Sequence, residues 1–314
     1  MSDNPDISVV MSVCNGATAL GASMDSVLSQ VGVNLELIVV NDGSTDDSGD
    51  ILQGYSNRDE RVRVIKQQNQ GLTRALIVGC SAARGKYIAR QDAGDISMPR
   101  RLIKQLNCIN KNRGSAFVSC GTRYIGPRGE HLYDVNQDTA EATTRLLTLN
   151  PDQLRGPSSH PSTMFARSLY EQVGGYRRAF YFAQDLDLWI RLAERGEHVV
   201  IPEILYEASV TVDSISSLFR QEQIELTRIM LEGARLRRSG TSEQDILKQA
   251  ESIRPSVGQP ISRVDRARAF YFIGSCLRRR NNPRAAYYFG QALKSYPFHL
   301  KSVVRLLAGW TASL

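Results

Sequence analysis

Residues 35–47 read LELIVVNDGSTDD, and this stretch decides the fold. Its first six residues favour a buried strand, and the polar turn that follows sets Asp42 directly behind that strand. The pattern returns fifty residues later, where the strand-like run Tyr87–Arg90 leads into a turn that carries Asp92 and Asp95. In open α/β sheets, ligands bind outside the carboxyl ends of the strands. The sequence therefore predicts a site lined by carboxylates, which suit a divalent cation, hydroxyl groups or a base edge rather than a bare phosphate.

Strand and helix signals alternate on both sides of this stretch. Strands are expected at 7–13, 35–40, 62–65 and 87–90, and helices at 20–30, shortly after residue 44, at 72–83 and at 99–106. Ser44 and Asp47 resemble a capping box that opens the second helix. After residue 116, two strands around a turn at 126–129 indicate an added antiparallel piece. The expected fold class is α/β, with a mixed, mostly parallel sheet flanked by helices.

The end of the chain carries a different pattern, which is helical throughout. It predicts two domains, an α/β domain at 1–215 and an all-helical region at 216–314. Helices are expected at 218–238, 241–253, 263–280, 283–295 and 298–307, with a linker at 255–260. The helix pair between 267 and 297 resembles one tetratricopeptide-like hairpin, but one unit is not an array, so a simple helical cap is the favoured interpretation.

Composition predicts an ordinary globular protein of the cytoplasm. Hydrophobic residues make up 42% of the 314 positions and charged residues 23%. No apolar run approaches the roughly 18 residues of a membrane span, and the polar, acidic N-terminus does not resemble a secretory signal. The five cysteines are scattered without a C-x-x-C pair, so buried, reduced thiols are expected.

Charge is unevenly distributed along the chain. From Arg220 onward there are 17 lysines and arginines against 7 acidic residues, whereas the first 219 residues carry 22 against 25. The basic tail has three interpretations: a solvated helical surface, a peripheral contact with the anionic inner face of a membrane, or a nucleic-acid contact. No nucleic-acid motif accompanies it, so nucleic acid is not an expected partner.

Two large enzyme classes are disfavoured because their phosphate-binding loops are missing. There is no G-x-x-x-x-G-K-[ST] loop, and no G-x-G-x-x-G follows the first strand. The chain therefore does not resemble a P-loop enzyme or a hydride-transfer enzyme.

Several blocks together resemble family 2 glycosyltransferases. In order, they are VVMSVCN at 9–15, VVNDGSTD at 39–46, GKYIARQDAGD at 85–95, and a divided acceptor-side block made of HPSTMF at 160–165, GGY at 174–176 and QDLDLW at 184–189. The resemblance spans roughly residues 5 to 210. It implies a GT-A fold, a nucleotide-sugar donor, usually a divalent cation, and inversion at the anomeric carbon.

The same resemblance implies residue roles. Asp42 would accept a hydrogen bond from the donor's base, most often uracil, and Asp185 would be the general base. The remaining assignments are Val13, Asn15, Ser44 and Asp92 to the donor, Asp92 and Asp95 to Mn²⁺ or Mg²⁺, and His160, Asp187 and Trp189 to the acceptor side. The roles make chemical sense: a cation offsets charge that develops on a leaving diphosphate, and a sugar hydroxyl needs a carboxylate to accept its proton.

Three positions depart from the family pattern. Cys14 stands where an aromatic residue often stacks on the base, so stacking is lost or supplied elsewhere. Gly94 replaces the second carboxylate of the usual D-x-D, which leaves the cation to Asp92 or Asp95. Gln184 replaces the acidic neighbour of the presumed base. These departures leave the donor, the use of metal and the possibility of an inactive relative open.

Simpler interpretations exist for several of the residues assigned so far. The turn at 42–44 also suits a helix cap, and acidic residues such as Asp185 and Asp187 favour the first turn of any helix. His160 suits a structural hydrogen bond, and Trp189 a place in the core. For Arg74, on the helix expected at 72–83, a contact with the donor diphosphate and a solvated surface position both stay open.

The sequence as a whole predicts an inverting glycosyltransferase. The expected donor is a nucleotide-diphosphate sugar, most simply a UDP-sugar, and the expected acceptor is a glycan or lipid-linked hydroxyl in cell-surface polysaccharide synthesis. The rival hypotheses are a catalytically silent member that binds a nucleotide sugar or a partner, and a sugar nucleotidyltransferase. The sugar, the linkage and the oligomeric state cannot be derived from the sequence.

Overall fold

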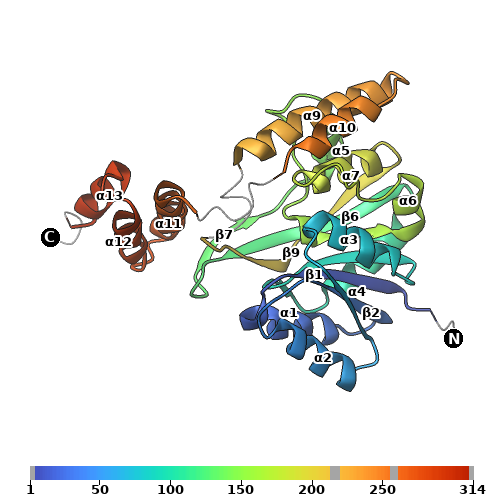
Figure 1. Ribbon diagram of the computed structural model, residues 1–314, viewed down its shortest axis with the longest axis horizontal. Helices are drawn as coiled ribbons and strands as arrows, with labels where there is room; N and C mark the ends of the chain where they lie inside the picture. The colour runs from blue at the N-terminus through green and yellow to red at the C-terminus, as the bar shows by residue number, and fades with distance from the viewer. Residues whose placement is uncertain (1–3, 213–219, 255–260, 311–314) are drawn as a thin grey trace. The chain divides into compact units, whose positions relative to one another are not determined.

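The computed structural model describes residues 4–212, 220–254 and 261–310 (Figure 1). The chain divides into two compact units, one within residues 1–122, 135–208 and 224–254 and the other within 123–134, 209–223 and 255–314. The domain boundary expected at 215/216 and the linker expected at 255–260 lie outside the described residues. No helix within the described ranges has the length and apolar character that crossing a bilayer requires.

The first unit begins with the strand–helix alternation that the sequence predicts. The elements are β1 (Ile7–Val13), α1 (Ala17–Leu28), β2 (Leu35–Asp42), α2 (Ser48–Arg58), β3 (Val62–Gln67), α3 (Leu72–Ser81), β4 (Tyr87–Asp92), β5 (Ile96–Ser97) and α4 (Arg101–Lys111). They continue with β6 (Ser115–Ile125), β7 (His131–Val135), α5 (Thr139–Leu147), the 3₁₀ helix η1 (His160–Ser162), β8 (Thr163–Ala166), α6 (Arg167–Gln172), α7 (Gln184–Ala193), β9 (Glu197–Ser209), α9 (Arg220–Arg238) and α10 (Gln244–Ser252).

The sheet has a parallel half and an antiparallel half. Its strand order is β3-β2-β1-β4-β8-β6-β9-β5, with β7 paired to β6. The strands β3, β2, β1 and β4 run parallel, whereas β8 runs antiparallel to both β4 and β6. The α/β class with a mixed sheet is thus confirmed, including the antiparallel addition expected after residue 116.

The core of this unit lies around β1 and β2, whose residues are almost all buried. Figure 1 shows α1 and α2 on one side of the parallel strands and α3 on the other, as right-handed crossovers require when the strand order reverses at β1. Gly79 of α3 lies directly on β1, since an added Cβ would sit 2.6 Å from a methyl carbon of Val10. The carboxyl ends of the parallel strands are left free to form a site.

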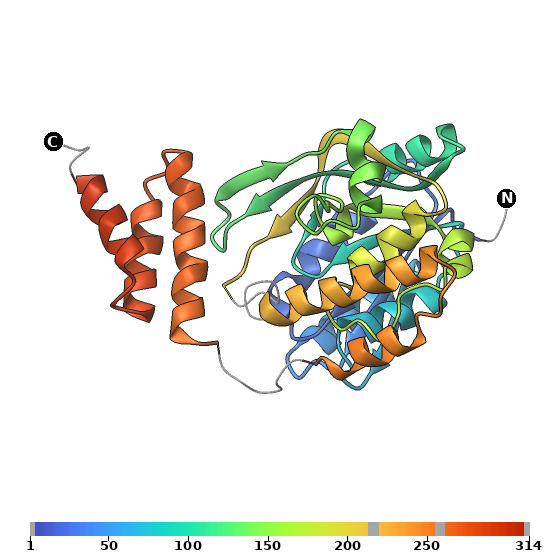
Figure 2. The same cartoon turned by 90° about the horizontal axis from the view of Figure 1, so that it is seen from above.

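The second unit contains the end of the β6–β7 hairpin and the helices α11 (Arg263–Arg279), α12 (Ala285–Ser295) and α13 (Leu300–Trp310) (Figure 2). Leu132 of the hairpin shares a hydrophobic cluster with Ile273, Leu277 and Phe289. Gly274 allows α11 and α12 to approach, because a Cβ there would meet the Phe289 ring at 2.9 Å. The two helices form the hairpin that the sequence indicates.

Candidate active site

Strand register brings the predicted donor residues to one edge of the sheet. Val13 at the end of β1 is paired with Asn41 of β2, and Ser12 is paired with Asp92 of β4. Asp42, the last residue of β2, therefore lies near both, although it is fifty positions from Asp92 in the chain. Val13 and Asp42 are buried, and the Asp92 side chain is 37% exposed.

The loops after β1 and β2 are joined by hydrogen bonds. The N–H of Asn15 donates to Ser44 Oγ at 3.0 Å, and the N–H of Thr45 donates back to Asn15 Oδ1 at 2.8 Å. The N–H of Ala17 donates to Asp46 Oδ2 at 3.0 Å, so a residue of the second loop caps the first helix. The predicted capping box is wrong: α2 begins at Ser48, and its N-cap residue makes no side-chain cap.

Asp42 is held by the loop between β3 and α3. Its Oδ1 accepts from Gln67 Nε2 at 2.7 Å and from the N–H of Gln70 at 2.9 Å, and its Oδ2 accepts from the N–H of Gly71 at 2.9 Å. These bonds fix the Asp42 carboxylate at the carboxyl end of β2. Arg74, one turn further on, is exposed and donates to Gln70 Oε1 at 2.9 Å, so both interpretations of Arg74 remain.

A buried arginine lies beneath Asp92. Arg90 has no exposed surface, and its guanidinium donates to Asp92 Oδ1 at 2.6 Å and to the carbonyl of Val10 at 2.5 Å. Burial is the largest influence and acts to lower the pKa of Arg90, but Asp92, with smaller contributions from Tyr176, Cys80 and Tyr206, raises it overall. The ion pair uses one oxygen of the Asp92 carboxylate, and the Asp92 side chain is 37% exposed.

The acidic turn after β4 supplies one accessible carboxylate. Gly94 adopts φ 97°, a conformation that suits glycine, and Asp95 is buried, with its N–H donating to the carbonyl of Asp92. Within the described ranges, no three His, Cys, Asp or Glu side chains gather as a metal cluster would. The turn therefore fits a cation held through Asp92, with the oxygens of a bound diphosphate and water completing the coordination, as is common for Mg²⁺.

Asp185 lies in the first turn of α7, close to Asp92. Its Oδ1 accepts from the N–H of Leu186 at 2.9 Å. Burial raises the pKa of Asp185, and the negative charge of Asp92 raises it further. The carboxylate forms no ion pair within the described structure, which leaves it available to accept a proton.

Asp187, two residues further on, has different surroundings. It is 1% exposed, and its carboxylate bridges Arg177 and Arg191, with Arg191 Nη2 at 2.6 Å from Oδ2. Burial alone would raise the pKa of Asp187, but the two guanidinium groups lower it below its ordinary value. These bonds describe a structural ion pair, and the acceptor-side role of Asp187 stays a prediction.

His160 and Trp189 lie together behind Asp185. His160 Nε2 and the Tyr176 hydroxyl share a hydrogen bond of 2.6 Å, and the His160 ring meets the edge of Trp189 with centroids 5.7 Å apart. Burial, followed by the charge of Arg90, lowers the pKa of His160 well below its ordinary value, so the ring is neutral. Trp189 is 3% exposed and packs on Gly156, as the core interpretation expects; neither acceptor-side assignment is tested by these contacts.

Two residues near the site were not predicted. Arg90 stands inside a quoted block, and its place within a buried strand was the signal that it must pair with an acid. Tyr181 lies on the loop before α7, and its ring covers Gly71 beside Asp42. Cys14 is exposed instead of buried, and its sulfur accepts from Asn69 Nδ2 at 3.2 Å.

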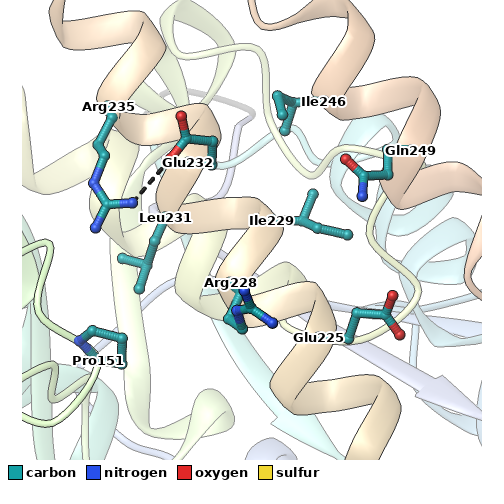
Figure 3. Close-up of a pocket in the computed structure, with 9 residues that line it drawn as sticks. All are labelled: Pro151, Glu225, Arg228, Ile229, Leu231, Glu232, Arg235, Ile246 and Gln249. Atoms are coloured by element: carbon teal, nitrogen blue, oxygen red, sulfur yellow. Dashed lines mark hydrogen bonds and ion pairs between the residues drawn. The ribbon is translucent and has the colours of Figure 1, made fainter.

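A separate cavity of about 380 Å³ lies along α9 and α10 (Figure 3). Arg228, Glu232 and Arg235 line it together with apolar side chains such as Ile229, and Glu232 binds Arg235 at 2.9 Å. None of the predicted site residues lines this cavity, so it is separate from the carboxylate edge of the sheet.

A parallel half-sheet with an aspartate at the end of β2 and an acidic turn after β4 is an arrangement that a GT-A glycosyltransferase has. The chain belongs to glycosyl transferase family 2, whose model matches residues 8–174. It is similar to EpsE of Bacillus subtilis (strain 168), which is named as a glycosyltransferase: 34% of 207 aligned residues are identical, covering 62% of this chain and 69% of EpsE.

Solved structures share the fold at low sequence identity. TarS 1–349 of S. aureus, solved with UDP-GlcNAc, has a TM-score of 0.58 and 16% identity over 92% of this chain and 89% of its own. The mannosyltransferase PcManGT of Pyrobaculum calidifontis, solved with GDP-Man and Mn²⁺, has a TM-score of 0.57 and 15% identity over 98% and 84%. These likenesses show the fold, and they confirm the GT-A class expected from the sequence.

Proposed function

We propose that this glycosyltransferase inverts the anomeric carbon of a nucleotide-diphosphate sugar and transfers the sugar to a hydroxyl of a glycan or lipid-linked acceptor. The observation that carries the proposal is the pair of carboxylates at the carboxyl edge of the sheet. The Asp92 carboxylate is paired with the buried guanidinium of Arg90, and Asp185 has a raised pKa and no ion-pair partner within the described residues. One carboxylate suits a cation and the other suits a proton.

The proposed step moves two electron pairs and one proton. The acceptor oxygen forms a bond to the anomeric carbon while the bond between that carbon and the diphosphate oxygen breaks, and the leaving diphosphate keeps the electron pair. The proton of the acceptor hydroxyl passes to the carboxylate of Asp185. A base is more effective when its pKa approaches the working pH, and the raised pKa of Asp185 is in that direction.

Donor binding is proposed to use Asp42, Val13, Asn15, Ser44 and Arg74. The fixed carboxylate of Asp42 is set to accept from a base N–H, and Arg74 is exposed on the adjoining helix. We favour a UDP-sugar, because uracil has an N–H for that carboxylate and the similar TarS was solved with UDP-GlcNAc. PcManGT was solved with GDP-Man, so a GDP-sugar is the alternative donor.

A divalent cation is proposed to bind at Asp92, with Asp95 supporting the turn rather than binding the cation directly. When bound, Mn²⁺ or Mg²⁺ would offset the charge that builds on the leaving diphosphate. The observation behind this assignment is that the Asp92 side chain is 37% exposed, whereas Asp95 is buried. PcManGT, which was solved with Mn²⁺, supports cation use in this fold.

The helices of the second unit are proposed to contact an anionic membrane on the cytoplasmic side, where a lipid-linked acceptor would be held. Between residues 261 and 306 there are ten lysines and arginines and one acidic residue. Exposed apolar side chains accompany them: Phe298, Leu300 and Val304 are 76%, 74% and 62% exposed, and Lys301 and Arg305 lie beside them in the chain. Basic charge with exposed apolar groups suits a lipid surface better than nucleic acid, which offers no apolar layer.

A panel of nucleotide sugars tests the donor proposal. The purified protein is heated with each UDP-, GDP- and dTDP-sugar, with and without Mn²⁺, because a ligand of the native state raises the melting temperature by mass action. A selective shift that depends on Mn²⁺ supports the proposal and names the donor. No shift with any nucleotide would remove the donor site and favour a silent, partner-binding member of the family.

A further inference from the structure

The loop before α7 reaches across to the donor side of the site. Thr73 Oγ1 donates to the carbonyl of Phe180 at 2.8 Å, which holds the loop against the start of α3. The next residue, Tyr181, lays its ring on Gly71: an added Cβ at Gly71 would lie 2.7 Å from Tyr181 Cε2. Because the N–H of Gly71 donates to Asp42, the ring stands beside the carboxylate assigned to the base.

This position matters because the first loop offers no aromatic surface. Cys14, the first residue of that loop, is exposed and presents a thiol where a base would need a flat, apolar partner. Burial and then the negative charge of Asp42 raise the pKa of Tyr181, and Cys14 adds to the effect, so the phenol is neutral and close to both residues. The Tyr181 ring is partly exposed and therefore accessible to a ligand.

An arginine from outside the matched family region supports the same loop. Arg254 follows α10, and its guanidinium lies 6.0 Å from the centroid of the Tyr181 ring. It donates to the carbonyls of Ala179 at 3.2 Å and Arg178 at 3.3 Å. Burial lowers the pKa of Arg254, the negative charge of Glu251 acts to raise it, and the positive charge of Arg74 acts to lower it.

We propose that Tyr181 is the stacking surface for the donor's base, and that Arg254 holds the loop that carries this ring. The inference rests on the proposed donor site at Asp42. It makes the loop before α7 and the end of α10 a second wall of that site. Base specificity would then depend on residues beyond the region that matches the family model, which ends at residue 174.

Calorimetric titration with two probes tests the inference. UDP, or the nucleoside diphosphate that the donor panel identifies, contains a base, whereas inorganic pyrophosphate does not. Stacking on one aromatic ring is worth about five- to hundredfold in affinity. We expect Tyr181→Ala to weaken the nucleotide by about that factor and to leave pyrophosphate unchanged, and Tyr181→Phe to bind like the wild type. Arg254→Ala should weaken the nucleotide and leave pyrophosphate unchanged, because Arg254 acts through the loop that carries Tyr181.

A rescue variant separates stacking from damage to the fold. Cys14→Phe restores an aromatic surface in the first loop, so the double variant Cys14→Phe, Tyr181→Ala should regain most of the lost affinity. If Tyr181→Ala melts at a lower temperature than the wild type, Tyr181→Leu, which keeps apolar bulk, replaces it in the titrations. Unchanged or tighter nucleotide binding by Tyr181→Ala would overturn the inference. Absence of nucleotide binding by the wild type would instead overturn the proposed function.

Discussion

Removing the charge of each aspartate at the start of α7 should affect a different property of the protein. Loss of the Asp187 charge should lower stability, whereas loss of the Asp185 charge should lower turnover. Asp187→Asn leaves the buried guanidinium groups of Arg177 and Arg191 without the carboxylate that bridges them. Removing one partner of a buried ion pair costs about 3–5 kcal/mol. For a unit of this size, that free energy corresponds to a fall in melting temperature of roughly 6–20 °C.

Asp185→Asn should barely affect stability. The pKa of Asp185 is raised by burial, so the folded protein already disfavours its charged form, and a neutral side chain is tolerated. Turnover should fall by about 10²- to 10⁴-fold, since that is the usual contribution of a general base. Binding of the donor should persist.

Thermal melts and single-turnover assays with the identified donor measure both effects. The pKa of Asp187 is lowered in the fold, so its contribution to stability is present at neutral pH and is lost as the pH falls through the folded pKa. The wild type should therefore lose stability over this acid range, and Asp187→Asn should lose less. A stable Asp187→Asn, or an Asp185→Asn with full turnover, would refute the division of roles.

Three further outcomes are expected. Turnover should fall on acidification at a pH above the ordinary aspartate value of about 3.9, because Asp185 must be ionised and its pKa is raised; a flat rate down to that pH would contradict the base assignment. Gly71→Ala should lower the free energy of unfolding by about 1–3 kcal/mol in denaturant melts, since φ is 85° and the Cβ meets a tyrosine ring, whereas Gly54→Ala, which meets nothing within 4 Å, should not. Leu300→Asp should reduce co-sedimentation with vesicles of phosphatidylcholine and phosphatidylglycerol, while Val31→Asp, at a residue of the other unit that is 66% exposed against 74% for Leu300, should not. Binding to pure phosphatidylcholine or to nucleic acid alone would argue against the membrane proposal.

The parallel half of the fold could be predicted because its signals are local. The runs at β1 and β2 are continuous and β-branched, which is typical of buried parallel strands. β8 and β9 carry no comparable signal. In the case of β8, the strand has only four residues and is defined by its pairing with strands that are distant in the chain. The sequence therefore indicates that an antiparallel piece exists but not how it is ordered.

The candidate site likewise has residues that the sequence predicts and partners that it does not. Asp42, Asp92 and Asp185 stand in recognisable blocks, and strand register brings the first two together. Their partners could not be read from the sequence, because Arg90 and Tyr181 act through contacts made only in the folded chain. Ser44 is the clearest case: its local spacing suggests a helix cap, yet its hydroxyl accepts from Asn15, 29 positions earlier.

That bond between two loops limits how family members can be recombined. Each loop supplies acceptors for the other's backbone, through Ser44 and Asp46 in one direction and Asn15 in the other. A chimera that exchanges the loop after β1 alone would pair foreign acceptors with native donors and leave exposed N–H groups unmatched. The two loops therefore form one transplantable cassette, and grafting a donor preference from a relative should move both together.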